Sequence, residues 1–204
     1  MYPSKGGYSQ TGKGYDMKIC AFLGSPRKEG NTAHVLNWIL EEAKNNGHKV
    51  ELVYLQDQKI SGCKECFACQ KIVDRPGCSI KDDMQKLYLK ILEADCILIA
   101  TPVFTWSVSA MTKAFLERTY CFEKFSEDGS YISFVEDKRC GLVVTAAGDE
   151  FDGADLIVES YRRMVEFHRM KNIGHLVVAN IRTQKDLLNP NVEQAARKFV
   201  SSIK

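Results

Sequence analysis

Long uncharged apolar runs and a large excess of one charge are both missing from this sequence. The longest uncharged apolar stretch, residues 96–111, is interrupted by Thr, Pro and Ser, and it is shorter than the roughly 20 apolar residues that a membrane-spanning helix needs. The 28 Lys and Arg residues nearly balance the 26 Asp and Glu residues, which leaves a formal net charge of +2. So small an excess excludes a broad electrostatic surface for nucleic acid or an anionic membrane.

The N-terminus also lacks the apolar core of a secretory signal peptide, because its first 16 residues are rich in Gly, Ser and Tyr. We interpret residues 1–16 as a flexible arm and residues 17–204 as one domain, long enough to bury a core of its own. A secreted disulfide scaffold is therefore a poor explanation of the eight cysteines, and we expect a soluble, cytoplasmic protein.

Short apolar runs rich in β-branched residues recur along the chain and predict five strands, at residues 18–23, 49–55, 95–100, 139–145 and 174–179. Several are almost continuously apolar, as expected of parallel strands buried on both faces. Helical patterns lie between and after them, at residues 36–43, 82–92, 109–120, 152–170 and 192–203. This alternation predicts an α/β domain with a doubly wound, five-stranded parallel sheet, and fold analogy gives the strand order 2-1-3-4-5.

Two connections are too long to be simple turns. Residues 56–81 hold four of the eight cysteines, and residues 122–138 are polar with interspersed aromatic side chains. Long loops in a compact domain are usually functional or disordered. Since ligands of open parallel sheets bind beyond the carboxyl ends of the strands, we expect the site in the loops after the first, third and fourth strands.

The loop after the first strand, GSPRKEGNT at residues 24–32, is neither a Walker A loop nor a dinucleotide-binding G-x-G-x-x-G motif. It offers the hydroxyls of Ser25 and Thr32, the amide of Asn31, the guanidinium of Arg27 and backbone N–H groups at a helix N-terminus. Together these groups make a cradle for one phosphate monoester. The alternative is an ordinary turn in which Asn31 or Thr32 caps the helix.

The loops after the third and fourth strands can border a planar ring. TPVFTWS at residues 101–107 places Phe104 and Trp106 at the sheet edge, although either side chain could instead be a core or interface hydrophobe. TAAGD at residues 145–149 is small enough to let backbone approach a flat ligand closely. A monophosphate cradle and two edges for a planar ring describe FMN better than NAD or ATP.

Three ordered motifs, GSPRKEGNT, GCKECFACQ…GCSIKDDM and TPVFTWSVSAMTKAFLER, resemble the flavodoxin-like NAD(P)H-dependent FMN reductase family, and most of all its iron–sulfur flavoprotein branch. The resemblance implies a three-layer α/β/α fold. It also implies FMN ligands: Ser25, Arg27, Asn31 and Thr32 at the phosphate, and Pro102, Val103, Phe104, Trp106, Thr145, Ala147 and Gly148 around the isoalloxazine ring.

The cysteines of the long loop, Cys63, Cys66, Cys69 and Cys78, have the spacing C-x2-C-x2-C-x8-C. Compact C-x2-C-x2-C runs typically hold [4Fe–4S] clusters, while four thiolates also suit zinc. A flavin nearby favours iron, because zinc has no redox chemistry to couple to it. The iron–sulfur branch resembles this pattern with a shorter last gap, and reduced or partly disulfide-bonded thiols without a metal are the other alternative.

We therefore predict an FMN-dependent oxidoreductase that takes electrons from NAD(P)H or a reduced carrier such as ferredoxin, with a [4Fe–4S] cluster that passes single electrons. The family resemblance and the apolar loops imply a homodimer or tetramer. The alternatives are a plain NAD(P)H-dependent FMN or quinone reductase without a cluster, and a non-enzymatic zinc or thiol redox sensor. No catalytic side chain is predicted, because the redox chemistry belongs to the cofactor.

Several polar residues are interpreted without a role in catalysis. Asp82 and Asp83 are expected to cap a helix. His168 lies in a basic segment with Arg162 and Arg163, which we interpret as solvated surface. Lys113 and Arg118 match helix positions of the family motif, where they could lie near the flavin or a subunit interface, or form a surface ion pair.

Overall fold

The computed structural model describes residues 16–203, so the arm expected over residues 1–16 lies outside the described residues except for Asp16. Its main sheet is parallel and has the order β2-β1-β3-β6-β7. The strands are β1 (Lys18–Leu23), β2 (Lys49–Tyr54), β3 (Cys96–Pro102), β6 (Arg139–Thr145) and β7 (Lys171–Val178). The predicted parallel sheet and its strand order are thus confirmed.

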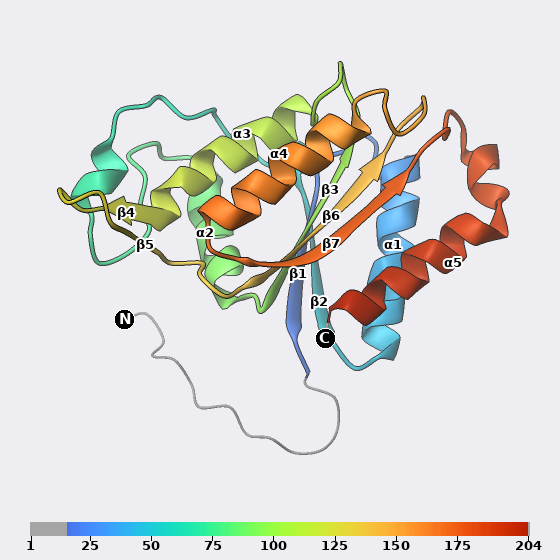
Figure 1. Ribbon diagram of the computed structural model, residues 1–204, viewed down its shortest axis with the longest axis horizontal. Coiled ribbons are helices and arrows are strands. Elements are labelled where there is room, and N and C mark those ends of the chain that lie inside the picture. The colour runs from blue at the N-terminus through green and yellow to red at the C-terminus, as the bar shows by residue number, and fades with distance from the viewer. Residues whose placement is uncertain (1–15, 204) are drawn as a thin grey trace.

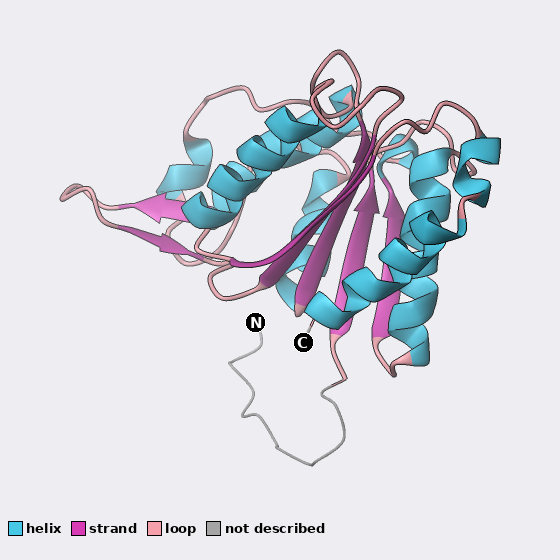
Figure 2. Ribbon diagram, turned by 45° about the vertical axis from the view of Figure 1, so that its right-hand side comes forward, coloured by secondary structure: helices cyan, strands magenta, loops and turns pink. Residues whose placement is uncertain are grey.

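Helices cover both faces of this sheet and give the molecule its three layers (Figure 1 and Figure 2). One face carries α1 (Asn31–Asn45) and α5 (Pro190–Phe199), and the other carries α2 (Met84–Glu93), α3 (Ala110–Arg118) and α4 (Ala154–Phe167). Short 3-10 turns cover Leu55–Asp57, Ala68–Lys71, Thr119–Phe122, Gln184–Leu188 and Val200–Ser202. None of the helices over residues 16–203 is long and apolar enough to cross a membrane.

Strand β1 shows why the sheet needs both helical layers. Its side chains alternate between the two cores: Cys20 and Phe22 pack with the α2, α3 and α4 side, whereas Ile19, Ala21 and Leu23 pack with the α1 and α5 side. All five of these side chains have 0% exposed area. An almost continuous apolar run is therefore required here, since neither face of the strand meets water.

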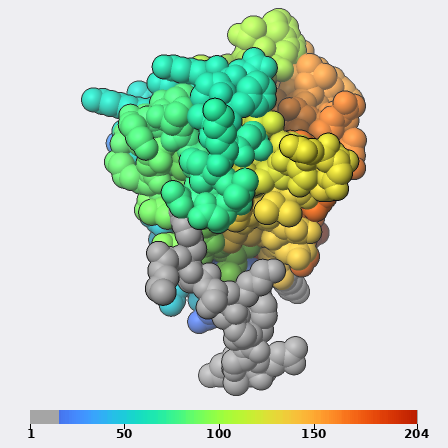
Figure 3. Space-filling view, turned by 90° about the vertical axis from the view of Figure 1, so that its left-hand side faces the viewer, coloured from blue at the N-terminus to red at the C-terminus, as the bar shows by residue number. Residues whose placement is uncertain are grey.

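The segment 122–138, expected as a long polar loop, contains an antiparallel hairpin of β4 (Glu123–Phe125) and β5 (Tyr131–Ser133). The ring of Phe125 lies 5.7 Å from that of Tyr120 and 5.3 Å from that of Tyr131. The Tyr131 ring in turn stacks on Phe167 of α4 at 5.8 Å. The aromatic side chains of this insertion thus attach the hairpin to the ends of α3 and α4, beside the cysteine loop (Figure 3).

The interpretation of His168 as solvated surface is wrong. Its side chain is 5% exposed, and its Nδ1 lies 2.6 Å from Oε1 of Glu123, a residue with no exposed area. Its Nε2 lies 3.0 Å from the hydroxyl of Thr119. The neighbouring Arg162 and Arg163 are exposed as expected and pair with Glu159. Glu123 comes from the hairpin, so the partner that buries His168 is distant in sequence.

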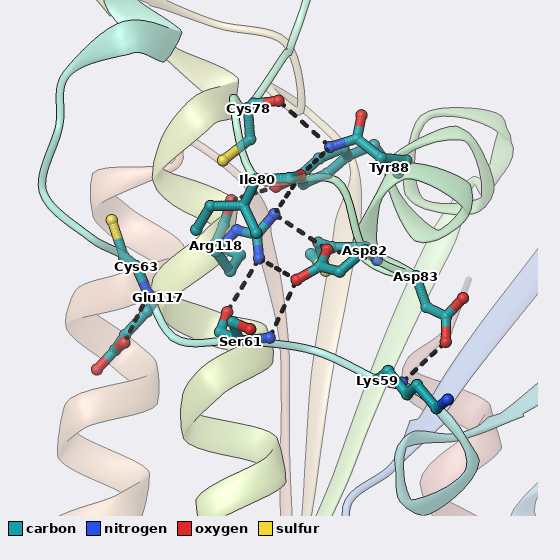
Figure 4. A network of polar contacts seen from close by, with 12 residues as sticks. Lys59, Ser61, Cys63, Cys78, Ile80, Asp82, Asp83, Tyr88, Glu117 and Arg118 are labelled. Atoms are coloured by element: carbon teal, nitrogen blue, oxygen red, sulfur yellow. Dashed lines mark hydrogen bonds and ion pairs between the residues drawn. The ribbon is translucent and has the colours of Figure 1, made fainter.

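A buried guanidinium at the end of α3 closes the base of the cysteine loop (Figure 4). Arg118 Nη1 donates to the carbonyl of Ser61 at 2.9 Å and to Oδ2 of Asp82 at 2.6 Å. Its Nη2 donates to the carbonyl of Ile80 at 3.4 Å and to Oδ1 of Asp82 at 3.2 Å. The Arg118 side chain has 0% exposed area, so this is a buried ion pair and not a surface one. Lys113, by contrast, forms an exposed pair with Glu117.

Asp82 has a larger role than the helix cap that the sequence predicts. It does accept a hydrogen bond from the Met84 N–H at the start of α2, at 3.1 Å. It also accepts one from the Ser61 N–H at 3.0 Å. Burial alone would raise the pKa of this carboxyl, but the hydrogen bonds from Arg118 and from these two N–H groups outweigh burial and hold its pKa below the usual value. Asp83 accepts from the Lys59 N–H, close to the same loop end.

We expect Arg118→Met to destabilise the fold by about 3 kcal/mol, because it leaves the Asp82 carboxylate without its buried partner. For a domain of this size, that corresponds to a fall in Tm of roughly 10 °C. Thermal unfolding followed by circular dichroism measures it. Arg162→Met is the matched control, since it removes an exposed pair of little consequence. Equal falls in Tm for the two variants would show that the buried ion pair stabilises the fold no more than an exposed one.

Candidate functional site

A cavity of about 120 Å³ opens at the carboxyl edge of the sheet, where four loops meet. Most of the residues predicted for the cofactor line it: Ser25, Arg27, Asn31, Thr32, Pro102, Val103, Phe104, Thr145 and Ala147. Pro26, Ala146, Ile181 and Arg182 complete the lining. Trp106 and Gly148, predicted for the same site, are not among the lining residues. The structure therefore brings together both groups of predicted residues, phosphate-binding and ring-bordering, in one place.

The lining residues that carry hydroxyl and amide groups are buried, whereas Arg27 and Arg182 are exposed. Ser25 is 4% exposed, Asn31 9%, Thr32 2% and Thr145 5%. The hydroxyls of Thr32 and Thr145 lie 2.7 Å apart, which joins the loop after β1 to the end of β6. Asn31 Nδ2 donates to the carbonyl of Ile181 at 3.3 Å. The cavity is thus lined by polar groups that are already held in place before any ligand binds.

Helix α1 begins at this cavity without a capping side chain. Gly30 occupies the N-cap position, and no side chain accepts a hydrogen bond from the first N–H groups of the helix. The alternative interpretation, in which Asn31 or Thr32 caps the helix, is therefore wrong. Since a helix leaves its first N–H groups without intrahelical partners, these donors remain available to an anion at the N-terminus of α1.

A buried group of hydroxyls fixes the loop after β1 to the start of α3. The hydroxyl of Ser109 donates to the carbonyl of Gly24, and the Ser109 N–H donates to the hydroxyl of Thr101 at 3.1 Å. A Cβ atom at Gly24 would lie only 1.7 Å from Oγ1 of Thr112, so this close approach requires glycine. The loop that forms the polar end of the cavity thereby takes its position from α3.

The aromatic residues after β3 lie on a tight turn. Phe104 and Ser107 exchange backbone hydrogen bonds of 2.8 and 3.0 Å, and the two residues between them have positive φ angles of 49° at Thr105 and 55° at Trp106. Phe104 is 48% and Trp106 63% exposed, so neither is a core residue in this chain. Trp106 borders a separate cavity of about 320 Å³ between α3 and α4.

All four cysteines of the long loop line one further cavity, of about 780 Å³, at the other end of α3. It is enclosed by the loop, the 3-10 turn after α3 and the end of α4, and its other lining residues include Leu116, Tyr120, Met164 and His168. Glu65 and Phe67 have positive φ angles of 51° and 54°. These left-handed residues turn the chain between the cysteines. The Cys63 N–H donates to Oε2 of Glu117 on α3 at 3.1 Å.

The loop thiols differ from the remaining cysteines in exposure. Cys63 and Cys66 are exposed and Cys69 and Cys78 half-buried, whereas the other four are buried, and none of the eight forms a disulfide within residues 16–203. A hydrogen bond with Ser79, at 3.3 Å, lowers the pKa of the Cys66 thiol. Burial raises the pKa of Cys20 and of Cys121 to about 12. Among the described cysteines, only those of the loop are therefore accessible to solvent.

The loop thiols do not converge on a point as they lie. Within residues 16–203, no group of three or more His, Cys, Asp or Glu side chains is placed so that it could hold one metal ion. A larger hollow, of about 1230 Å³, lies at the opposite edge of the sheet, against α1 and α5. None of the predicted site residues lines it.

Four lining residues were not predicted from the sequence: Pro26, Ala146, Ile181 and Arg182. Pro26 and Ala146 lie within the predicted loops, whereas Ile181 and Arg182 follow β7, and the site was expected only after the first, third and fourth strands. Because β7 is parallel to β6 and adjacent to it, its carboxyl end reaches the same edge of the sheet. That topological argument, applied to the fifth predicted strand, could have found Ile181 and Arg182.

Comparison with known proteins gives results of three kinds. The family model "NADPH-dependent FMN reductase" matches residues 17–184. An iron–sulfur flavoprotein of Methanosarcina thermophila is 29% identical over 158 residues, which are 78% of each chain. One of Archaeoglobus fulgidus is 42% identical over 103 residues, 50% of this chain and 49% of the relative. An NAD(P)H:quinone oxidoreductase from Methanothermobacter marburgensis has the same fold, with a TM-score of 0.74, 15% identity, and coverage of 93% of this chain and 100% of that one.

The family match covers the loop after β1, the cysteine loop and the turn after β3, which carry the resemblance seen in the sequence. It confirms that resemblance: the chain belongs to the NADPH-dependent FMN reductase family, a family of oxidoreductases.

Proposed function

We propose that the protein binds FMN in the cavity at the carboxyl edge of the sheet, accepts reducing equivalents there from NAD(P)H, and passes electrons to a second acceptor. The observation that carries this proposal is the meeting of nine predicted cofactor residues in that one cavity. When bound, FMN supplies the exchange between two-electron hydride transfer and single-electron transfer. The chain's own part is to bind and orient the flavin.

At the polar end, Ser25, Arg27, Asn31 and Thr32 would hold the phosphate, together with the uncapped N–H groups of α1. At the other end, Pro102, Val103 and Phe104 would border one edge of the ring, with Thr145 and Ala147 at another. Trp106 and Gly148 stay predictions as ring neighbours. Among residues 16–203, no His, Asp or Glu side chain lines the cavity. Hydride transfer to a flavin requires none, because the redox chemistry belongs to the cofactor.

We expect the purified protein to hold about one FMN per chain and its flavin absorption band to bleach within seconds of anaerobic mixing with NADPH or NADH. Thr32→Val removes a hydroxyl at the polar end with little change in volume, and we expect it to weaken FMN binding about tenfold. Stopped-flow absorbance and fluorescence titration measure the two effects. If reduced ferredoxin bleaches the flavin band and NAD(P)H does not, the protein is an electron carrier. A chain that takes up no FMN would favour the non-enzymatic sensor.

We also propose that the four loop cysteines hold a [4Fe–4S] cluster. The donor set fits, because soft thiolate sulfur suits iron–sulfur clusters, and all four side chains line one cavity. When bound, such a cluster would supply single-electron transfer. The names of the archaeal relatives agree with this proposal.

We expect about four irons per chain in anaerobically purified protein, with a broad visible shoulder beneath the flavin bands that dithionite bleaches. Cys69→Ser should lose most of this iron and retain its FMN, because the two cavities are separate. Cys96→Ala, a buried thiol of β3, is the matched control and should keep both. Clean flavin bands without iron would leave an FMN or quinone reductase, and one zinc per chain would overturn the cluster.

We further propose that a second copy of the chain covers the exposed apolar side chains near the flavin cavity, giving a homodimer or tetramer. Phe104 is 48%, Trp106 63% and Phe151 80% exposed, and a Cβ atom at Gly153 would lie 2.6 Å from Cα of Trp106, so these segments adjoin. Sedimentation at micromolar concentration should give a dimer or larger, and Trp106→Ser should shift it toward the monomer. A monomeric wild type would contradict the proposal. The cytoplasmic location and a ferredoxin partner stay predictions.

A further inference from the structure

A second guanidinium lines the cavity in which we propose that the flavin binds. Arg182 follows β7 and lines the same cavity as Arg27, which belongs to the loop after β1. The two cations come from opposite ends of the chain, and both are exposed at the cavity mouth. Neither side chain forms an ion pair with a carboxylate of the described residues. The carboxylate of Asp186 interacts electrostatically with Arg182 from the adjoining turn, but none of the described carboxylates lines the cavity that the two guanidinium groups border.

The backbone on both sides of Arg182 is held to the cavity loops. The Ile181 N–H donates to the carbonyl of Ala146 at 2.9 Å, and the Ile181 carbonyl accepts from Asn31 at 3.3 Å. The N–H of Arg182 itself donates to Oδ2 of Asp186 at 2.9 Å. The loop after β7 is therefore hydrogen-bonded to the residue after β6 and to the start of α1. These bonds hold the backbone from which the Arg182 side chain extends.

Gln184 adds a second attachment between the same two loops. Its Nε2 donates to the carbonyl of Glu29 at 2.7 Å, in the loop after β1. The turn that carries Gln184 is closed by a capping box of Thr183 and Asp186, in which each side chain accepts from the backbone of the other residue. The loop after β7 is thus hydrogen-bonded at two points to the segment of Glu29 and Asn31 at the start of α1.

The side chain of Arg182 is also oriented. Its Nε donates to the carbonyl of Ala147 at 3.3 Å, at the edge of the cavity formed by the loop after β6. This contact uses one of the five N–H donors of the guanidinium and leaves both terminal nitrogens for another acceptor. A planar guanidinium held in this way suits a phosphate group, which can accept two parallel hydrogen bonds from it.

We propose that Arg182 binds the phosphate of FMN together with Arg27, and that it thereby determines the preference for FMN over riboflavin. The inference rests on the proposed FMN site and adds a ligand to it. Two guanidinium groups balance a phosphate monoester that carries nearly two negative charges at neutral pH. Riboflavin has the same ring without the phosphate, so Arg182 contributes to the affinity of FMN and leaves that of riboflavin unchanged.

The test compares Arg182→Gln with the wild type in fluorescence titrations against FMN and against riboflavin, at low and at high salt. We expect the Kd for FMN to rise about tenfold at low salt, as the loss of one charged hydrogen bond at an exposed site predicts, with no change for riboflavin. The dependence of FMN affinity on salt should also become weaker. Lys185→Gln, an exposed lysine of the adjoining turn outside the cavity lining, removes the same charge and should change neither ligand.

Equal Kd values for FMN in the wild type and Arg182→Gln would overturn the proposal. A parallel loss for riboflavin would also overturn it, because Arg182 would then act on the ring or on the loop as a whole. If Lys185→Gln raised the Kd for FMN equally, the loss of one positive charge from the chain would explain the effect, and a contact of Arg182 with the phosphate would not. A wild type that binds neither flavin is a different outcome, which refutes the FMN site itself.

Discussion

One buried charge holds the cysteine loop in place. The side chain of Arg118 has no exposed area and that of Asp82 only 10%, so each charge depends on the other for compensation in a region that water does not reach. The same guanidinium donates to the carbonyls of Ser61 and Ile80, one near each end of the loop. The ends cannot separate without breaking this charge balance. A loop whose thiols are exposed or half-buried thus has a rigid base, although its own residues bury little apolar surface.

Helix α3 connects that base to the cavity at the carboxyl edge of the sheet, where we propose that FMN binds. Ser109, which caps the helix, holds the carbonyl of Gly24 in the loop after β1, while Glu117 and Arg118 at the other end hold the cysteine loop. Nine helical residues at about 1.5 Å each separate the two anchoring points by about 13 Å. This short helix lies over the sheet (Figure 1). Packed there through the buried Phe115, it sets the relative position of the two cavities.

The parts of this structure that follow from local pattern could be predicted, and those that depend on distant partners could not. Continuous apolar runs predicted the sheet, and the ends of those runs located the loops that line the flavin cavity. His168 stands in a basic segment, and its buried partner Glu123 is 45 residues away in the sequence. The hairpin was missed because β4 and β5 have three residues each, which is too few to show the alternation of apolar and polar side chains that marks a strand. Strand β7 begins earlier than predicted, with polar residues typical of a sheet edge.

The net charge of the chain does not reveal the electrostatics of the candidate site either. A formal charge of +2 excludes a broad basic surface, yet it does not say which cations are compensated. Arg118, Arg162 and Arg197 all pair with carboxylates, so their charges are largely neutralised where they stand. Arg27 and Arg182 have no such pair and face the same cavity. An anion site at this cavity, as we propose, would therefore depend on the few guanidinium groups that form no ion pair, and it would need no excess of basic residues.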